Sequence, residues 1–466
     1  MAVVLTHLQG RSVGVFGLAR SGLGTVRAAA AGGAKVFAWD DREGARREAE
    51  QLGATSAEPK DWPWDGLHCL VLSPGVPLTH PEPHPAVRMA QAAGVAILSD
   101  IELLWREAEG RAKFVAITGT NGKSTTTALI GHVLAAAGMK VSVGGNIGRA
   151  ALDLDAPQDG RVYVIEMSSY QLDLTERFRP DVVVWLNLTP DHLDRHGDLA
   201  GYAKAKARIF ANTDACDTAI VGIDEPEMET IAAAIRSERR GTLRTISVGR
   251  HPEASLYVDA TSGALTEDGS AAASLELLPT LRGAHNWQNA AAAWGAARAF
   301  GIEPEAILAA MQSFPGLAHR MELLGRQGSV LFVNDSKATN ADAAAKALAT
   351  FEPIYWIAGG QPKAGGIAGL SEFFPKVAKA YLIGTAADEF SGTLSGIVPH
   401  VIAGDLQTAI RLAADDAALD PRPEPAVLLS PACASFDQFA DFEARGDAFK
   451  RLFSMLGEHR PMEAFA

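Results

Sequence analysis

The sequence is poor in cysteine, and the three cysteines that it has are widely separated. Cys69, Cys216 and Cys433 are odd in number and lie in different parts of the chain. This number and spacing exclude a disulfide framework and a pattern of zinc ligands. A chain of this kind fits a reducing compartment best.

The sequence also lacks an excess of positive charge. Its formal net charge is −13, whereas general nucleic-acid-binding proteins rely on basic surfaces. We therefore expect no nucleic acid among its partners. A ligand with several phosphate groups must be held by local groups rather than by the overall field of the protein.

Long apolar runs and a secretion signal are missing as well. No uninterrupted apolar run in the sequence approaches the roughly 20 residues needed to cross a bilayer. Residues 1–10 lack the basic start and the small-residue cleavage site of a secretory signal. We therefore expect a cytoplasmic protein that does not insert into a membrane.

The sequence does contain enough apolar residues for several cores. Hydrophobic residues make up 47% of its 466 residues, and roughly 150 residues per domain suggests about three domains. Boundaries are expected in the polar stretch at residues 106–113 and at the break Phe314-Pro315-Gly316. We predict domains at residues 1–108, 109–315 and 316–466.

Short apolar runs alternate with helical stretches along nearly the whole chain. This alternation predicts α/β domains with mainly parallel, doubly wound sheets. A small antiparallel excursion is predicted at residues 253–278, where short alternating runs are mixed with turn residues. The predicted strands lie at residues 12–17, 35–39, 67–72, 113–118, 162–165, 181–186, 330–334, 354–358, 379–383 and 426–430.

The strongest local signal is a glycine-rich loop at residues 118–125, TGTNGKST, between a predicted strand and a predicted helix. Its glycines let backbone N–H groups surround phosphate oxygens. The helix N-terminus and Lys123 add positive charge, and Ser124 adds an oxygen for Mg²⁺. The loop predicts binding of a nucleoside triphosphate, but it does not distinguish a ligase from a motor, a kinase or a switch.

Further candidate side chains follow the strands next to this loop. Glu166 ends a predicted strand, and His192 follows the next one. Carboxyl ends of parallel strands face the ligand crevice, so both side chains can reach a Mg²⁺ ion at the loop. Lys204 and Lys206 lie in the helical stretch at residues 202–210. Residues two apart do not share a helix face, so at most one points into the site, and spacing alone fits a solvent-exposed surface for both.

Eight motifs together resemble the Mur ligase family in order and spacing. They are GTNGKST, EMSSYQL, TPDHLDRHG, AKARIF, HNWQN, HRME, NDSKATN and SPACASFDQF, and they span nearly all of the last two predicted domains. The resemblance implies an N-terminal Rossmann-like domain that binds a UDP-linked substrate. It also implies a central ATPase domain with a mostly parallel sheet and a C-terminal Rossmann-like α/β domain that binds an amino acid.

The resemblance further implies ATP and two Mg²⁺ ions as cofactors. The implied metal ligands are Ser124, Glu166, His192 and Lys206, the last as a carbamate, which replaces a repelling ammonium with an oxygen anion. The implied catalytic residues are Lys123, Glu166, His192, Lys206 and Arg320. The implied ATP-binding residues are Gly119, Thr120, Asn121, Gly122, Lys123, Ser124, Thr125, Asn286, Asn289, Arg320 and Asp335.

Within the family, the first and third domains resemble those of the D-glutamate-adding enzymes. More than a hundred residues precede the phosphate loop, which disfavours folylpolyglutamate synthase, and the D-N-P motif of the diaminopimelate- and lysine-adding relatives is absent. The first glycine turn departs from the G-L-G-x-[ST]-G pattern by carrying Ala19. The implied UDP-substrate residues are Arg20, Ser21, Asp40, Asp41, Arg42, Ser73, Gly75 and Asn146.

The implied D-glutamate-binding residues combine two lysines with two hydroxyl groups, which suits a dicarboxylate whose charge must be compensated when it leaves water. They are Lys337, Thr339, Lys363, Ser435 and Phe442.

The activity implied by the resemblance is the ATP-dependent joining of D-glutamate to UDP-N-acetylmuramoyl-L-alanine through an acyl phosphate. The products would be ADP, phosphate and a peptidoglycan precursor, formed by a monomer in the bacterial cytoplasm. One alternative is a Mur ligase that adds another amino acid. Two others are a regulatory NTPase and a nicotinamide-dependent oxidoreductase. The opening glycine turn and Asp40 suggest the oxidoreductase, but that function would leave the phosphate loop unexplained.

Overall fold

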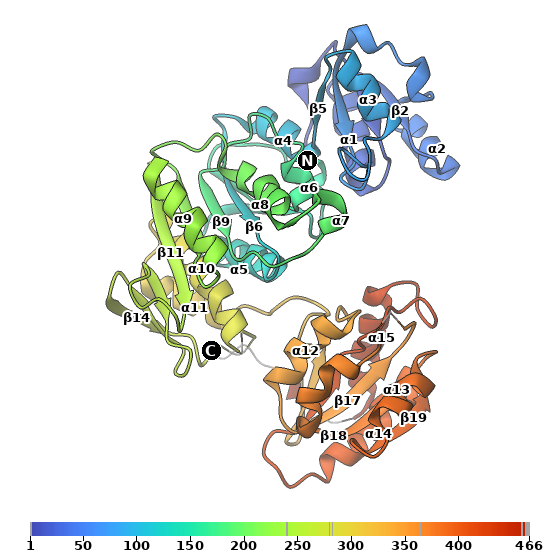
Figure 1. Cartoon of the computed structure of the whole chain (residues 1–466), viewed down its shortest axis with the longest axis vertical. Helices are drawn as coiled ribbons and strands as arrows, with labels where there is room; N and C mark the ends of the chain where they lie inside the picture. The colour runs from blue at the N-terminus through green and yellow to red at the C-terminus, as the bar shows by residue number, and fades with distance from the viewer. Residues whose placement is uncertain are drawn as a thin grey trace. The chain divides into compact units, whose positions relative to one another are not determined.

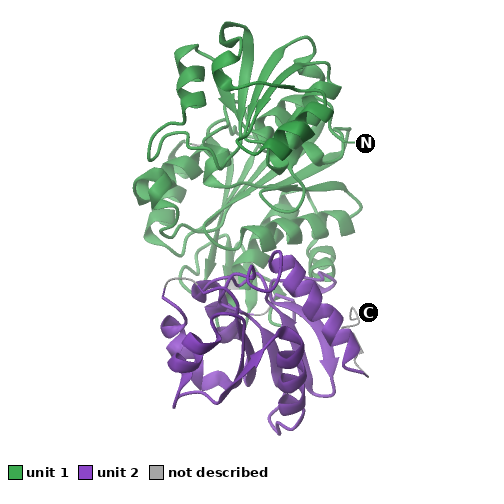
Figure 2. Cartoon of the chain, turned by 90° about the vertical axis from the view of Figure 1, so that its right-hand side faces the viewer, with its two compact units in different colours: residues 1–276, 284–311 green, residues 277–283, 312–466 purple. Residues whose placement is uncertain are grey.

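The computed structural model describes residues 2–238, 241–278, 280–281, 283–362, 365–457 and 460–461. The chain divides into two compact units (Figure 2), and each is described by itself. Unit 1 comprises Met1–Glu276 and Ala284–Met311, and unit 2 comprises Leu277–Gly283 and Gln312–Ala466. Unit 1 carries two sheets and unit 2 carries one (Figure 1).

The first sheet of unit 1 has five parallel strands in the order β3-β2-β1-β4-β5. The order reverses between β1 and β4, and such a switch point opens a crevice at the carboxyl ends of these strands. The strands are β1 (Ser12–Phe16), β2 (Lys35–Trp39), β3 (Thr55–Ser56), β4 (Leu67–Leu72) and β5 (Ala96–Leu98). The helices are η1 (Thr6–Leu8), α1 (Arg20–Ala31), α2 (Glu43–Gln51), η2 (Pro59–Asp61), η3 (Trp64–Gly66), α3 (Pro85–Ala92) and α4 (Asp100–Ala108).

The second sheet of unit 1 has nine strands in the order β14-β13-β12-β11-β10-β9-β6-β8-β7. It is parallel from β7 to β12, and β13 and β14 add an antiparallel hairpin. Its first strands are β6 (Ala112–Thr118), β7 (Lys140–Gly145), β8 (Arg161–Glu166), β9 (Val182–Trp185) and β10 (Thr218–Gly222). The others are β11 (Thr242–Val248), β12 (Leu256–Val258), β13 (Ala264–Glu267) and β14 (Ser270–Ser274).

The helices that accompany this sheet differ widely in length. They are α5 (Lys123–Ala136), η4 (Ala151–Asp153), α6 (Ser169–Leu172), α7 (Leu193–His196), α8 (Leu199–Ala207), η5 (Arg208–Phe210), α9 (Pro226–Glu238), α10 (Ala284–Ala299) and α11 (Pro304–Gln312). All four residues of β9 are buried, as expected for a parallel strand covered on both faces, which reads as a continuous apolar run.

The sheet of unit 2 has the order β19-β18-β17-β20-β16-β15-β21, with β15 antiparallel to both of its neighbours. The strands are β15 (Glu322–Gln327), β16 (Val330–Asn334), β17 (Ile354–Gly359), β18 (Val377–Ile383), β19 (His400–Gly404), β20 (Ala426–Leu429) and β21 (Arg460–Pro461). The helices are α12 (Ala341–Thr350), η6 (Ala368–Lys376), α13 (Ala387–Leu394), α14 (Leu406–Ala418) and α15 (Phe442–Met455).

Alternation along β16 divides the interior of unit 2 into two cores. Leu331 and Val333 pack with residues of α12 and α13, whereas Val330 and Phe332 pack with residues of α14 and α15. Successive side chains of a strand point to opposite faces, so each face of the sheet gains its own apolar layer.

The predicted fold class is confirmed: all three sheets belong to α/β architectures, and the antiparallel excursion is the hairpin formed by β13 and β14. The proposed boundary at residues 108/109 falls at the end of α4, inside unit 1. The three domain ranges therefore stay a prediction. Among the residues that the structure describes, no helix combines the length and the apolar character needed to span a bilayer.

Glu102 of α4 forms a buried junction with the segment that follows α6. Its carboxylate accepts hydrogen bonds from the backbone N–H groups of Glu176 (3.0 Å), Arg177 (3.1 Å) and Phe178 (2.9 Å). The Nε atom of Arg106 donates to the same carboxylate at 2.7 Å. The side chain of Glu102 is fully buried.

We predict that Glu102→Leu lowers the free energy of unfolding by about 3–5 kcal/mol, because it leaves three backbone N–H donors without their acceptor and removes one of the two carboxylate partners of Arg106. Glu102→Gln, which keeps one carbonyl acceptor, should cost about 1–3 kcal/mol. Urea unfolding monitored by tryptophan fluorescence measures both. Glu109→Gln, at the exposed ion pair with Arg177, is the matched control, and equal effects of the three changes would contradict the prediction.

Candidate active site

The phosphate loop joins β6 to α5 in a conformation that requires glycine. Gly119 has φ 152° and Gly122, at the N-cap of α5, has φ 81°. A Cβ atom at Gly122 would lie 2.2 Å from Oδ1 of Asn289. The first backbone N–H groups of α5 therefore begin at a tight, left-handed turn, which is the geometry that suits a phosphate group.

Two lysine side chains share one carbonyl oxygen of this loop. Nζ of Lys123 donates to the carbonyl oxygens of Gly119 (2.9 Å) and Thr120 (2.8 Å). Nζ of Lys206 donates to the same Gly119 oxygen at 2.8 Å and lies 3.3 Å from Oγ1 of Thr118. The two predicted cationic residues thus meet at the loop.

Lys206 is buried, and its surroundings lower the pKa of its amine. Only 1% of the residue is exposed, and its Nζ lies 4.5 Å from the ring centre of Tyr202. Burial, and then the charge of Lys123, lower the pKa of Lys206 to about 7. Lys204 is exposed. Helix spacing allowed either lysine to point toward the phosphate loop, and burial favours Lys206.

Glu166 supplies a buried carboxylate at the end of β8. It is 2% exposed, and its Oε1 accepts a hydrogen bond from Nδ2 of Asn146 at 2.9 Å. Its Oε2 is buried and has no hydrogen-bond partner in the described part of the chain. A buried carboxylate oxygen without a donor is an uncommon state that a cation would satisfy.

His192 follows β9, and its side chain remains accessible. It has the left-handed φ of 52° at the N-cap of α7, and its side chain is 47% exposed. Its ring centre lies 5.0 Å from that of Tyr170 and 6.3 Å from that of Tyr202. Tyr202 therefore contacts both His192 and Lys206.

Glu166 and His192 alone supply only part of the ligands that a magnesium ion needs, unless Lys206 is carbamylated. Within the described ranges, no three His, Cys, Asp or Glu side chains gather closely enough to hold a metal ion. Glu166 and His192 are two such residues, and a carbamate on Lys206 would add oxygen ligands. The buried, unpartnered Oε2 of Glu166 supports a cation at this position.

The predicted UDP-substrate residues of the first sheet follow β1, β2 and β4. Asp40 accepts the backbone N–H of Leu18 at 2.7 Å and pairs with Arg42 at 3.0 Å, and these donors hold the pKa of the Asp40 carboxyl at about 2 despite the opposing effect of burial. A Cβ atom at Gly17 would lie 2.5 Å from Cβ of Ser73. The turns after β1 and β4 therefore touch.

Two arginines connect these turns to the second sheet. Nη1 of Arg20 donates to the carbonyl oxygen of Gly148 at 2.8 Å, next to the segment that carries Asn146. Nη1 of Arg195, close to His192, lies 3.4 Å from the carbonyl oxygen of Gly75. Two of the predicted substrate residues, Arg20 and Gly75, are therefore hydrogen-bonded to segments that belong to the second sheet.

In unit 2, Asp335 holds the segment that carries Arg320. Its Oδ1 accepts the backbone N–H of Met321 at 3.1 Å, and its Oδ2 accepts the hydroxyl of Ser430 at 2.8 Å. His319 and Met321 on either side of Arg320 have positive φ values of 63° and 45°. Burial raises the pKa of Asp335 to about 7.

The predicted D-glutamate residues that the structure describes gather beside this segment. Nζ of Lys337 lies 5.2 Å from the ring centre of Phe442, and the Lys337 N–H donates to the carbonyl oxygen of His319 at 2.9 Å. Ser435 is buried, and Thr339 donates its N–H to the Lys337 carbonyl oxygen at 2.8 Å. Lys363 lies outside the described residues.

A buried arginine that the sequence did not single out joins the two loops of this cluster. Arg445 of α15 donates to the carbonyl oxygens of Ser336 (2.8 Å) and Cys433 (3.1 Å) and to the hydroxyl of Ser336 (3.0 Å). Tyr202 and Arg195 were missed in the same way, because each acts through contacts with residues distant in the sequence. In the sequence, only its position three residues after Phe442 could have indicated that Arg445 belongs to this cluster.

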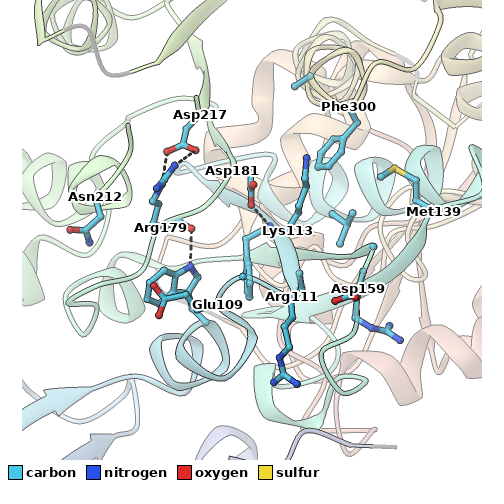
Figure 3. A pocket seen from close by; sticks show the side chains of 18 of the residues that line it. Glu109, Arg111, Lys113, Met139, Asp159, Arg179, Asp181, Asn212, Asp217 and Phe300 are labelled. Atoms are coloured by element: carbon cyan, nitrogen blue, oxygen red, sulfur yellow. Dashed lines mark hydrogen bonds and ion pairs between the residues drawn. The ribbon is translucent and has the colours of Figure 1, made fainter. Parts of the chain in front are cut away.

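A separate pocket of about 880 Å³ contains none of the predicted site residues. It is lined at the amino ends of β6, β8 and β9 and by Phe300 at the end of α10 (Figure 3). Two ion pairs lie among its lining residues, Arg179 with Asp217 at 3.0 Å and Arg177 with Glu109 at 3.3 Å. The phosphate loop follows the opposite, carboxyl end of β6.

The fold and this site define a nucleotide-binding α/β protein with a phosphate loop. Residues 117–297 match the Mur ligase middle domain, and residues 319–433 match the glutamate ligase domain of Mur ligases. The chain belongs to the Mur ligase family.

Relatives match this chain over almost its whole length. It is 51% identical over 461 residues to the UDP-N-acetylmuramoylalanine–D-glutamate ligase of Caulobacter sp. (strain K31), with 97% of each chain covered. It is also 51% identical to the ligase of the same name from Rhodopseudomonas palustris (strain HaA2), with 99% of this chain and 100% of the relative covered.

Solved structures of more distant Mur ligases share the fold. The UDP-N-acetylmuramate–alanine ligase of Thermotoga maritima has a TM-score of 0.58 at 18% identity, with 95% of this chain and 99% of that chain covered. The UDP-N-acetylmuramoylalanyl-D-glutamyl-2,6-diaminopimelate–D-alanyl-D-alanyl ligase of Acinetobacter baumannii has a TM-score of 0.52 at 18% identity, with 80% and 87% covered.

We predict that Asp335→Asn stabilises the protein at pH 8 while impairing activity. Because burial raises the pKa of Asp335 in the folded state to about 7, well above the ordinary value of an aspartate carboxyl, folding favours the protonated acid. The cost of the buried carboxylate is absent below about pH 4, grows as the pH rises to 7, and is fully present above it. The asparagine variant should therefore gain on the order of 2–4 kcal/mol at pH 8 and little at pH 4.

Thermal unfolding of both proteins across this pH range measures the difference. Asp342→Asn, at an exposed position in the first turn of α12, serves as the control. A stabilisation that does not change with pH would contradict the assignment of the buried charge to Asp335.

Proposed function

We propose that the chain joins D-glutamate to UDP-N-acetylmuramoyl-L-alanine, with ATP converted to ADP and phosphate, in the bacterial cytoplasm. The observation that carries this proposal is the identity of 51% over 97% of the chain with a ligase named for that reaction. A phosphate loop and a buried carboxylate with an unpartnered oxygen support the ATP-dependent part.

The chemistry of the proposed reaction requires activation of a carboxylate. A carboxylate is a poor electrophile because it is negatively charged and has no suitable leaving group. Transfer of the γ-phosphoryl group of ATP to the alanine carboxylate would give an acyl phosphate, in which both faults are removed. The amine of D-glutamate then attacks the carbonyl carbon, and phosphate leaves from the tetrahedral intermediate.

Lys123 and the N-terminus of α5 carry the phosphate-binding part of this proposal. The transfer brings two anions together, so positive groups fixed in place before the reaction lower its barrier. Lys123 is held on the Gly119 and Thr120 carbonyl oxygens at 2.9 and 2.8 Å. It would exchange these acceptors for phosphate oxygens. Arg320, Asn286, Asn289 and Asp335 are proposed as further nucleotide contacts.

Ser124, Glu166, His192 and a carbamate on Lys206 are the residues that we propose for two Mg²⁺ ions. When bound, magnesium would neutralise phosphate charge and polarise phosphoryl oxygens. The environment of Lys206 favours the modification, because a neutral amine is the form that reacts with carbon dioxide. Its burial and the nearby Lys123 charge lower its pKa to about 7.

The proposed substrate contacts belong to two groups of residues, one for each substrate. Arg20, Ser21, Asp40, Asp41, Arg42, Ser73, Gly75 and Asn146 are assigned to the UDP-linked substrate, and Lys337, Thr339, Lys363, Ser435 and Phe442 to D-glutamate. The side-chain amine of Lys337 supplies a positive charge for a carboxylate of D-glutamate. The ring of Phe442 beside it supplies an apolar surface for the methylene groups of the amino acid.

The proposed function predicts selective, ATP-dependent ligation of D-glutamate. Purified protein with UDP-N-acetylmuramoyl-L-alanine, ATP and Mg²⁺ should release phosphate and form the new amide only with D-glutamate. The parallel reactions contain L-glutamate, L-alanine, L-lysine or diaminopimelate, and product is measured by mass spectrometry. A faster reaction with any of these four amino acids would overturn the proposed specificity.

We further predict that Lys206→Arg lowers kcat by about a hundredfold or more, because a guanidinium keeps the charge but cannot form a carbamate. The wild-type protein incubated with ¹³C-bicarbonate should show a carbamate carbon signal that the variant lacks. Lys204→Arg, on the exposed side of α8, is the matched control. Full activity of Lys206→Arg would remove the carbamate from the mechanism.

A further inference from the structure

Asn187, directly after β9, binds the phosphate loop through its side-chain amide. Oδ1 of Asn187 accepts the backbone N–H groups of Thr120 at 3.1 Å and Asn121 at 2.8 Å. Its Nδ2 donates to the carbonyl oxygen of Asn121 at 3.2 Å. The amide thus pairs with Asn121 in both directions, as a neighbouring strand would, and it is 8% exposed.

A second side chain fixes the orientation of this amide. Nδ2 of Asn187 also donates to Oε1 of Gln288 at 3.0 Å. Gln288 lies on α10 between Asn286 and Asn289, and Asn289 accepts the hydroxyl of Thr126 at 3.1 Å. Helix α10 therefore supports the phosphate loop through Gln288 and Asn187, and through Asn289 it supports the first turn of α5, which follows the loop.

The same loop is tied to the segment that leads to His192. Oγ1 of Thr120 accepts the N–H of Thr189 at 3.0 Å and donates to the Thr189 carbonyl oxygen at 3.1 Å. Together with the Asn187 contacts, these bonds fasten the loop to residues 187–189. A shift of the loop therefore has to shift the start of the His192 segment as well.

The contacts of Asn187 also determine which loop amides are engaged before a ligand binds. The N–H groups of Thr120 and Asn121 donate to Asn187, and a backbone N–H supplies one hydrogen. Phosphate oxygens are therefore received chiefly by the amides that follow Gly122 at the start of α5, and by Lys123. Gly122, with its left-handed φ of 81°, lies between the N–H groups bound by Asn187 and the N–H groups at the start of α5.

We propose that Asn187, oriented by Gln288, is a positioning residue that holds the phosphate loop in its nucleotide-binding conformation and couples it to the His192 segment. This role rests on the proposed ATP-dependent function and deepens it. Asn187 itself does not touch the reacting atoms. Its amide supplies both an acceptor and a donor, a combination that neither aspartate nor a hydrophobic side chain reproduces.

The test compares nucleotide binding with amino-acid use in Asn187→Asp, Asn187→Ala and Gln288→Leu. Binding of ATP and Mg²⁺ is measured by calorimetry in the absence of the other substrates, and the KM values for ATP and D-glutamate are measured separately. We expect the Kd for ATP to rise about 10- to 50-fold in both Asn187 variants, since two to four hydrogen bonds are lost or reversed. The rise for Gln288→Leu should be about 3- to 10-fold.

The KM for D-glutamate should stay within about twofold of the wild-type value, since the loop is not part of the proposed amino-acid site. Asn212→Ala is the matched control, because Nδ2 of Asn212 also donates to two backbone carbonyl oxygens, those of Glu176 (2.9 Å) and Phe178 (3.1 Å). It lines the separate pocket of Figure 3. Its thermal midpoint measures what the loss of a loop contact costs in stability alone.

An unchanged Kd for ATP in Asn187→Ala, with normal binding by the wild type, would overturn the positioning role. Equal losses for ATP and D-glutamate, matched by a lower thermal midpoint than that of Asn212→Ala, would also overturn it, since they would show a general loss of structure. Failure of the wild-type protein to bind ATP would instead contradict the proposed function. The two failures are therefore distinguishable.

Discussion

The carbonyl oxygen of Gly119 is the point at which the two lysines of the proposed catalytic site meet. It accepts hydrogen bonds from both Lys123 and Lys206. Two ammonium groups on one acceptor repel each other, and Lys206 is the more deeply buried of the two. Burial and the charge of Lys123 lower the pKa of Lys206 to about 7, which favours the neutral amine that the proposed carbamate requires.

Sheet topology explains why these groups meet. The phosphate loop, Glu166 and the segment with Asn187 and His192 follow β6, β8 and β9, which are adjacent and parallel. Parallel strands present their carboxyl ends at one edge, so residues dozens of positions apart in sequence reach the same place. The separate pocket at the amino ends of these strands has no such convergence of predicted catalytic groups.

The sequence was sufficient for the fold class and for ten of the strands, whereas strands such as β7, β10 and β11 were not predicted and the site residues stay a prediction. Buried parallel strands appear as continuous apolar runs, so most were predicted within one or two residues, and the phosphate loop has a local pattern of its own. Burial decided between Lys204 and Lys206, because helix spacing alone allows either. Asn187 was not predicted, since its role arises from contacts across 66 and 67 positions, which no local pattern records. The raised pKa of Asp335 likewise depends on burial inside the folded unit 2.

The backbone around Arg320 has a consequence for the balance between stability and activity. His319 and Met321 both occupy the left-handed region without being glycine, a conformation that costs on the order of 1–3 kcal/mol for each residue. The Met321 N–H on Asp335 and the Lys337 N–H on His319 help to offset this cost. Glycine would relax the backbone but would also remove side-chain contacts, since Nδ1 of the buried His319 lies 3.1 Å from Nδ2 of Asn334 and Met321 packs against the core that contains Val333. The packing of its two neighbours therefore holds the backbone of Arg320 in a conformation that an isolated chain would avoid.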